Sequence, residues 1–232
     1  MKSWKPPKPQ EIYDLFQNSR SRLIQSEVHL LEATIESLVR FEDEIQGRGY
    51  TPVAINFWDY KDKLADKSVF RPKHEEILSD NVRNYLINDL NNVIIHREVD
   101  ISPSSTPDIV INALIPRSSQ DQNRVISIVV EVKRRWHQKL KNNMQDQLLE
   151  KYMKPRDLSH GLYLVGWFES EYWDPDDSKL KSPSIKRFQS IPDLNNYLQA
   201  QAQELSKEGF FIKGKVLDIS LNDIHLKRYR SL

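Results

Sequence analysis

Apolar residues in the first part of the chain recur at steps of three and four. From about residue 12 to residue 45 there is no proline or glycine, and one stripe of a predicted long helix holds Ile24, Val28, Leu31, Ile35, Leu38 and Ile45. The glycines at positions 47 and 49 mark the end of this helix. Residues 51–72 include several aromatic side chains but show no pattern that predicts an element.

From residue 74 onward, helix patterns and strand patterns alternate regularly. A helix is predicted over 75–90, followed by strands over 93–101, 108–115 and 125–133, with a polar turn at 117–123. A second helix over 138–153, ended by Pro155, leads to a strand over 161–168. A helix over 191–205 and a strand over 211–219 complete the chain. The central order αβββαβ predicts an α/β fold.

Composition and charge limit the classes of protein that fit. The pattern predicts two parts, a proline-rich start with the long helix and a linker over 1–72, and a main domain over 73–232, which is long enough for a real core. The absence of cysteine excludes disulfides and thiol nucleophiles, and no apolar run is long enough to cross a bilayer. We therefore expect a soluble, cytoplasmic protein without a membrane partner. The net charge of +1 means that a polyanion would have to be held by local basic clusters.

Charged residues occur at the ends of two neighbouring predicted strands, where burying a charge costs free energy. Asp108 follows Pro107 and opens one strand, while Glu131, Val132 and Lys133 close the next. Because strand side chains alternate between faces, Glu131 and Lys133 point the same way. If the strands are hairpin neighbours, Asp108 lies beside Glu131, and two close carboxylates favour a cation between them. Magnesium suits such oxygen ligands, to which the Val132 carbonyl could add one, and Lys133 could stabilise charge on a phosphate. The alternative is an ion pair on the rim of the sheet.

These residues and the order of elements resemble the PD-(D/E)xK nuclease superfamily, in which a Pro-Asp and an acid-x-Lys lie on successive strands of an αβββαβ core. The resemblance covers about residues 75–168 and implies a restriction-endonuclease-like core with a mixed sheet, to which the long N-terminal helix and the C-terminal helix and strand are added. It implies phosphodiester hydrolysis with magnesium, or manganese as a substitute, and catalysis by Asp108, Glu131 and Lys133. The sequence is also similar to nuclease domains of bacterial defence systems, which implies DNA ahead of RNA as the substrate.

Two polar residues on inward helix faces extend the predicted site. Glu75 falls in the angular sector of Leu78, whereas Glu76 does not. The resemblance implies a metal or water ligand on this helix, so Glu75 is predicted to support the metal; the alternative is that it only stabilises the helix N-terminus. Gln147 faces inward on the second helix, and the resemblance implies a catalytic role near the metal. Tyr152 follows with one residue more than the common Q-x-x-x-Y spacing and is predicted to lie in the core.

Basic residues cluster after the predicted catalytic lysine. Phosphates of a nucleic acid are predicted to be contacted by Arg134, Arg135, Lys139 and Lys151. The alternative for this run is a solvated face, with Lys151 as a snorkelling side chain. Trp136 and His137 either position a substrate or pack at the end of the strand.

Other chemistries have less support. The six glycines form neither a Walker loop nor a dinucleotide fingerprint, and the acidic run at Asp174, Asp176 and Asp177 is predicted to be a solvated loop. Two other functions stay open: a catalytically inert nucleic-acid-binding or assembly module on the same fold, and a hydrolase of small phosphate compounds. The long helix either forms a homodimer or packs on its own domain. Cleavage specificity could come from a partner protein.

Overall fold

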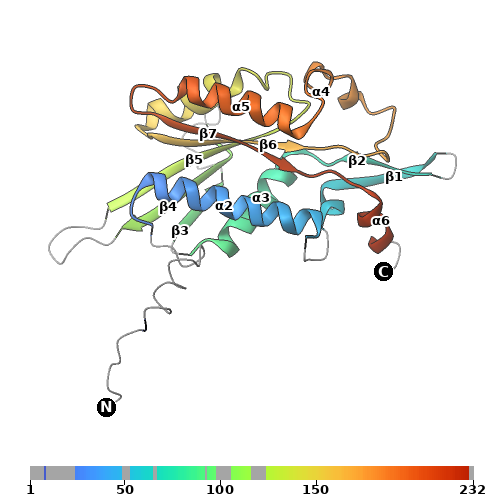
Figure 1. Ribbon diagram of the computed structural model, residues 1–232, viewed down its shortest axis with the longest axis horizontal. Helices are drawn as coiled ribbons and strands as arrows, with labels where there is room; N and C mark the ends of the chain where they lie inside the picture. Colours follow the sequence, from blue (N-terminus) through green and yellow to red (C-terminus); the bar gives the residue numbers. More distant parts are fainter. Residues whose placement is uncertain are drawn as a thin grey trace, which may run out of the picture.

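A five-stranded mixed sheet forms the centre of the computed structural model, which describes residues 8, 24–48, 53–64, 67–91, 93–97, 106–115 and 124–229 (Figure 1). The strands lie in chain order and are β3 (Val93–Arg97), β4 (Ile109–Ile115), β5 (Arg124–Arg134), β6 (His160–Trp167) and β7 (Phe211–Asp218). Neighbours from β3 to β5 are antiparallel, and neighbours from β5 to β7 are parallel. The predicted α/β fold with a mixed sheet, an N-terminal helix and a C-terminal helix and strand is confirmed. The predicted ends of the first strand (98–101) and the turn at 117–123 lie outside the described residues.

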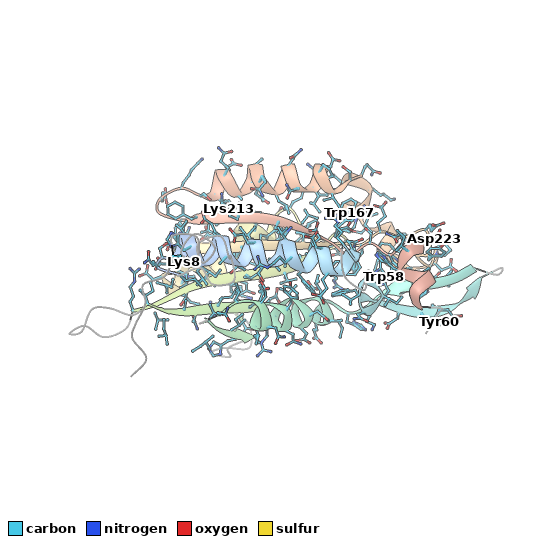
Figure 2. All side chains as sticks on the ribbon, turned by 60° about the horizontal axis from the view of Figure 1, so that its bottom comes forward. Lys8, Trp58, Tyr60, Trp167, Lys213 and Asp223 are labelled. Carbon is cyan, nitrogen blue, oxygen red and sulfur yellow. The ribbon has the colours of Figure 1, made fainter. Side chains whose placement is uncertain are left out.

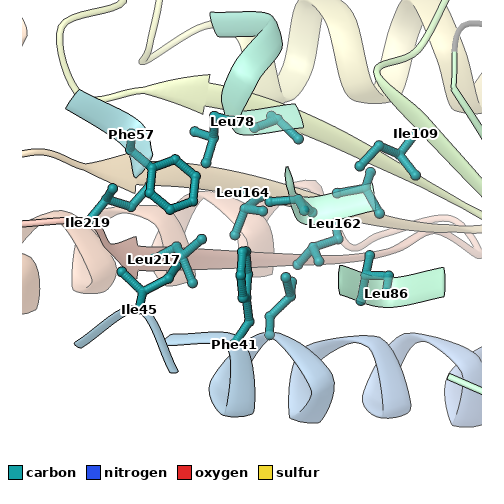
Figure 3. Close-up of a cluster of buried hydrophobic side chains, with 14 of the residues drawn as sticks. Phe41, Ile45, Phe57, Leu78, Leu86, Ile109, Leu162, Leu164, Leu217 and Ile219 are labelled. Atoms are coloured by element: carbon teal, nitrogen blue, oxygen red, sulfur yellow. The ribbon is translucent and has the colours of Figure 1, made fainter. Parts of the chain in front are cut away.

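Helices cover both faces of this sheet. On one face lie α2 (Glu27–Gln46) and α3 (Glu75–Asp89), and on the other lie η3 (Met144–Met153) and α5 (Ile191–Leu205) (Figure 1). Strand alternation separates the two cores: Val130 packs with α2 and α3, whereas Val129 packs with η3 and α5. Figure 3 shows the first core, where Phe41 of α2 lies close to Leu164 and Leu217 of the sheet.

Helix α2 is shorter than the predicted long helix. It begins after Ser26, whose hydroxyl accepts a hydrogen bond from the His29 N–H, because a serine at this position satisfies an otherwise unpaired amide. It ends at Gly47, whose φ of 73° suits glycine. Residues 24–26 are not helical, and residues 12–23 of the predicted segment lie outside the described residues.

The apolar stripe of α2 packs on its own sheet. Leu31, Leu38 and Ile45 are buried as predicted, while Val28 is 43% exposed and Phe41 fills part of the core. Leu31, Leu38 and Ile45 therefore pack within the chain, and Val28 does not. No described helix is long and apolar enough to span a membrane.

A hairpin occupies the stretch for which the sequence predicted no element. A short 3-10 helix, η2 (Ala54–Phe57), leads into β1 (Trp58–Leu64) and β2 (Lys67–Pro72), which pair antiparallel with an irregularity between Tyr60 and Asp62. Trp58 is buried, and its ring N–H donates to the Ile219 carbonyl at 3.0 Å. Figure 2 shows Trp58 and Tyr60 at the hairpin end of the molecule. Trp58 therefore belongs to the same buried cluster as residues of the central sheet.

The predicted α-helix over 138–153 is wrong in type and start. Residues 138–142 form turns, and the helix that follows, η3, is a π-helix whose closing N–H at Lys154 donates to Leu149, five residues back. Its buried residues are Met144, Leu148, Leu149, Tyr152 and Met153. Their recurrence at every four to five positions fits the wider turn of a π-helix. The remaining helical segments are η4 (Lys154–Arg156), η5 (Ser178–Lys181), α4 (Pro183–Arg187) and α6 (Asp223–Tyr229).

Candidate active site

The pairing of β4 with β5 fixes the position of Asp108. Ile109 pairs with Val130, so Asp108, one residue before the strand, lies level with Glu131. The Asp108 carboxylate accepts a hydrogen bond of 2.8 Å from the Val132 N–H. Val132 thus holds Asp108 by its backbone while its own side chain is fully buried. The predicted hairpin relationship of these two strands is present, and it brings the two carboxylates together.

Lys133 lies in the middle of three carboxylates that come from three elements. Its Nζ is 2.5 Å from Glu131 Oε1, 3.7 Å from Asp108 Oδ2 and 3.8 Å from Glu75 Oε1. Glu131 is 1% exposed and Lys133 is 7% exposed, although both carry ionisable groups. Charges are rarely buried this deeply unless they are paired, and here three acids share one ammonium group. We call these four residues the carboxylate–lysine cluster.

The protonation of the cluster follows from burial and from the excess of acids. Burial, and next the Asp108 carboxylate, raise the pKa of Glu131 to about 8, although Lys133 opposes them. Burial by itself would lower the pKa of Lys133, but the carboxylates of Glu131 and Asp108 outweigh it and the pKa is raised. One oxygen of Glu131 and one of Glu75 are buried without a hydrogen-bond partner among the described residues. The cluster therefore has more carboxyl oxygens than its single lysine can satisfy.

These oxygens suit a hard divalent cation. Within the described residues, no group of three or more histidine, aspartate or glutamate side chains is arranged to hold a metal ion, and the Lys133 ammonium lies between the carboxylates. The unpaired buried oxygen of Glu131 and the adjacent Asp108 are nonetheless the donors that magnesium or manganese prefers. The residues that could hold such an ion are Asp108 and Glu131, with the backbone of Val132 beside them.

Glu75 faces the cluster, and Glu76 does not. Glu75 is the first residue of α3; its Oε2 accepts from the Arg134 guanidinium at 2.7 Å, and its other oxygen faces Lys133. Glu76 is exposed. Glu75 thus points toward the cluster and Glu76 toward solvent, as their angular positions on the predicted helix indicated. Arg134 is predicted to contact nucleic acid. The central carbon of its guanidinium also lies 4.9 Å from the centre of the Trp136 ring.

The π-helix brings Gln147 and Tyr152 toward the cluster. Gln147 is half-buried, and its side-chain oxygen has no hydrogen-bond partner among the described residues. Tyr152 is buried, as predicted, and burial followed by the charges of Glu131 and Asp108 raises the pKa of its phenol. The two residues are five apart, which is the span of one π-helical hydrogen bond. The residue in excess of the common spacing is therefore accommodated by the wider helix.

The predicted nucleic-acid contacts divide into buried and exposed residues. Arg135 is only 6% exposed. Its guanidinium donates to the carbonyls of Phe168 and Phe188, and the central carbon of the guanidinium lies 3.5 Å from the centre of the Trp167 ring. Burial lowers the pKa of Arg135 to about 10. Arg135 is therefore a packing residue, which corrects its predicted role. Lys139 is exposed.

Lys151 and Trp136 both lie against aromatic side chains. Lys151 is partly exposed, and its ammonium lies 5.5 Å from the centre of the Tyr152 ring, as expected of a lysine whose stem covers an apolar surface. Trp136 is 8% exposed and packs against Phe168 and Trp173, so it offers no free ring face for a base.

His137 is a candidate that the sequence left undecided. Its Nδ1 accepts from the Lys139 N–H at 3.2 Å and lies 3.3 Å from the Asn143 amide nitrogen, which assigns the ring proton to Nε2. Burial, the largest influence, lowers the pKa of His137 and favours the neutral ring. The side chain lines a cavity of about 670 Å³ that Arg134 and Gln147 also line. No spacing in the sequence indicates this tautomer, because it depends on a turn formed by residues 137–143.

Comparison with known proteins identifies a family whose function is unknown. A family model described as "Domain of unknown function (DUF8371)" matches residues 55–170, half of the chain. The matched segment contains the whole carboxylate–lysine cluster, together with Gln147 and His137. No curated protein and no solved structure matches the chain.

Proposed function

The chain belongs to the family described as a domain of unknown function (DUF8371), and we propose that it is a magnesium-dependent nuclease of the PD-(D/E)xK type. One observation carries the proposal: Asp108, Glu131 and Lys133 meet at the ends of adjacent strands, and Glu75 completes the group from α3. A buried carboxylate that shares its lysine with two further acids is costly for a fold and is typical of catalytic sites.

Each side chain has a role that its surroundings favour. Asp108, held by the Val132 N–H, and Glu131 would bind the divalent ion, with the Val132 carbonyl as a further ligand. A bound magnesium ion would supply Lewis acidity and a water of lowered pKa. Lys133, once it no longer neutralises the carboxylates, would stabilise negative charge on the scissile phosphate. Gln147 carries an amide that can orient a water or phosphate oxygen.

Glu75 and His137 act at the edge of this centre. Glu75 holds Arg134 at 2.7 Å, and this ion pair keeps the guanidinium beside the site. The neutral His137 ring has its Nε2–H available as a donor to a phosphate oxygen. Neither residue needs to change protonation for this purpose.

A cleavage assay tests the proposal directly. Wild-type protein is incubated with plasmid, linear DNA and RNA, each with magnesium, manganese or EDTA; plasmid nicking separates internal cutting from trimming of ends. We expect cleavage with either metal and none in EDTA, with DNA cut faster than RNA. Wild-type cutting that survives EDTA would overturn the proposed chemistry.

Lys133→Met and Lys215→Met form a matched pair of variants for the same assay. Both lysines lie in strands of one sheet and pair with a glutamate, since Lys215 Nζ is 3.1 Å from Glu42. Lys133→Met should abolish cleavage and leave metal binding, while Lys215→Met should keep the cleavage rate within a few-fold. Full activity of Lys133→Met would reduce the cluster to a structural ion-pair network.

A catalytically inert binding module is the principal rival, and one observation favours it: Lys133 already pairs closely with Glu131. Calorimetric titration with magnesium and with manganese separates the two. A nuclease should bind metal and lose that binding in Asp108→Ala. If Lys133 permanently occupies the place of the metal ion, neither the wild type nor Asp108→Ala should bind metal.

A further inference from the structure

Two adjoining cavities open beside the carboxylate–lysine cluster. The first, of about 670 Å³, is lined by Arg134 and Gln147. The second, of about 580 Å³, continues from it, because both are lined by Gln138, Lys139 and Pro183. Together they form one path from the proposed active site, between the turn at 137–143 and the segment that contains η5 and α4. We call this path the basic track.

The charge of the track is positive along its whole length. The first cavity is lined by the cations Arg134, Lys139, Lys179 and Lys181, and the second adds Lys141, Lys186 and Arg187. Among the described residues that line either cavity there is no aspartate or glutamate. The chain as a whole carries a net charge of only +1, so this is a strong local concentration of one sign.

Several of these cations are available to a ligand. Lys139, Lys181 and Lys186 are exposed and form no ion pair with any residue in the described ranges. Arg134 and Lys179 are already held, the first by Glu75 and the second by the Pro72 carbonyl at 2.9 Å and by Asp177. Both held cations line the first cavity, and the exposed lysines line the first cavity, the second or both.

We propose that the basic track binds the sugar–phosphate backbone of a nucleic-acid strand and leads it to the carboxylate–lysine cluster. Lysines with free ammonium groups, an imidazole N–H and an absence of lining carboxylates match phosphate oxygens. Two linked cavities extend well beyond one phosphate group, which makes a polymer the substrate class and not a mononucleotide. The direction toward the cluster rests on the proposed nuclease function; the binding itself does not.

The chain offers two pairs of lysines for a matched test. Lys139→Ala/Lys186→Ala removes two charges from the track, and Lys207→Ala/Lys213→Ala removes two exposed charges elsewhere. Lys207 follows the C-terminal end of α5, whereas Lys186 precedes its N-terminal end, and a helix of 15 residues is about 22 Å long. Lys213 lies away from the β1–β2 hairpin end of the molecule (Figure 2).

Binding is measured by fluorescence anisotropy with a labelled single-stranded DNA of about 20 nucleotides and random sequence, in EDTA so that no cleavage occurs. The dissociation constant is followed over a range of salt concentrations. Each lysine that contacts a phosphate should contribute about 0.7 to the slope of log K against log salt, or about fivefold in affinity near 0.1 M salt. The track variant should therefore lose about 1.4 from the slope and about 25-fold in affinity, and the control variant should match the wild type.

The outcomes separate this inference from the proposed function. If the track variant alone loses DNA binding and the wild type never cleaves, the proposed role of the basic track is supported and the proposed nuclease function is contradicted. Equal losses in the two double variants, or an unchanged salt slope in the track variant, would overturn the track whether or not the protein cleaves. Turnover of a mononucleotide without any oligonucleotide binding would overturn it as well.

Discussion

Two groups of buried carboxylates in this chain differ in how completely their oxygens are hydrogen-bonded. Asp174 accepts from the Arg71 guanidinium at 2.7 Å and from the Asp176 N–H at 3.0 Å. Asp177 accepts from the Trp173 ring N–H at 2.9 Å. The backbone hydrogen bond from Asp176 is the main reason why the pKa of Asp174 is lowered. Asp174 thus holds the loop after β6 against the hairpin through Arg71.

The carboxylate–lysine cluster shows the opposite condition. Glu131 has one oxygen on Lys133 and the other without a partner among the described residues, and its pKa is raised to about 8. A fold can bury a carboxylate stably when it supplies enough donors, as it does at Asp174. Where the fold supplies too few hydrogen-bond donors, the buried carboxylate can bind a cation instead. The balance of donors, and not burial alone, distinguishes the candidate active site from a structural cluster.

The largest expected effect is on cleavage. Asp108→Asn and Glu131→Gln remove one anionic ligand each with little change of shape, and each should lower kcat/KM on the order of 10²–10³-fold or more. Asp174→Asn, at the satisfied cluster, should leave kcat/KM within a few-fold. Cleavage kinetics on plasmid, beside calorimetric magnesium titration, measures both quantities. Similar losses at Asp174 and Asp108 would remove the distinction between the two clusters.

The next effect is on stability and lies in the satisfied cluster. Asp177→Ala leaves the buried Trp173 ring N–H without its acceptor, at a cost of about 1–3 kcal/mol in the free energy of unfolding. For a chain of this size, Tm should fall by about 2–4 °C for each kcal/mol. Asp176→Ala, with an exposed side chain, is the control and should melt like the wild type. A Tm for Asp177→Ala equal to that of the control would show that the Trp173 N–H finds another acceptor.

The sequence predicted those elements whose core-facing residues and capping residues lie close together in the sequence. The helix over 191–205 has its predicted bounds, because Ser190 caps it and Pro192 occupies its first turn. The positions of Asp108, Glu131 and Lys133 also follow from strand alternation and from the pairing of two consecutive strands. Such features depend on residues close in the sequence.

The features that the sequence missed depend on distant residues. Asp174 and Asp177 were predicted to be solvated and are buried, since Arg71, about a hundred positions earlier, pairs with Asp174. Arg135 was predicted to contact nucleic acid and is buried against Phe188. The basic track joins the turn after β5 to α4, and no spacing within either segment indicates the other.

A smaller effect on cleavage is expected at the edge of the cluster. Glu75→Gln weakens the hold on Arg134 and removes a carboxylate from Lys133, so activity should fall by about 10–100-fold, as for other residues that support metal ligands. Glu76→Gln changes an exposed neighbour in the same helical turn and should have no effect. The two variants are compared by cleavage rate at saturating magnesium. Equal and near-normal rates would show that α3 supplies packing alone.

The smallest expected effect is the response of stability to pH, and it has opposite signs in the two clusters. The pKa of Glu131 is raised in the folded protein, so the stability linked to this group is present below its ordinary pKa of 4.5 and is lost as pH rises toward about 8. Glu131→Gln cannot ionise and avoids this loss. In EDTA, its Tm relative to the wild type should therefore rise as the pH is raised from about 5 to about 8.5. The pKa of Asp174 is lowered, so Asp174→Asn should be destabilising at neutral pH, and its deficit should shrink as the solution is acidified. Calorimetric Tm values for the three proteins, extended below pH 3.8 for Asp174→Asn, measure both signs. A difference between Glu131→Gln and the wild type that does not change with pH would contradict the raised pKa of Glu131.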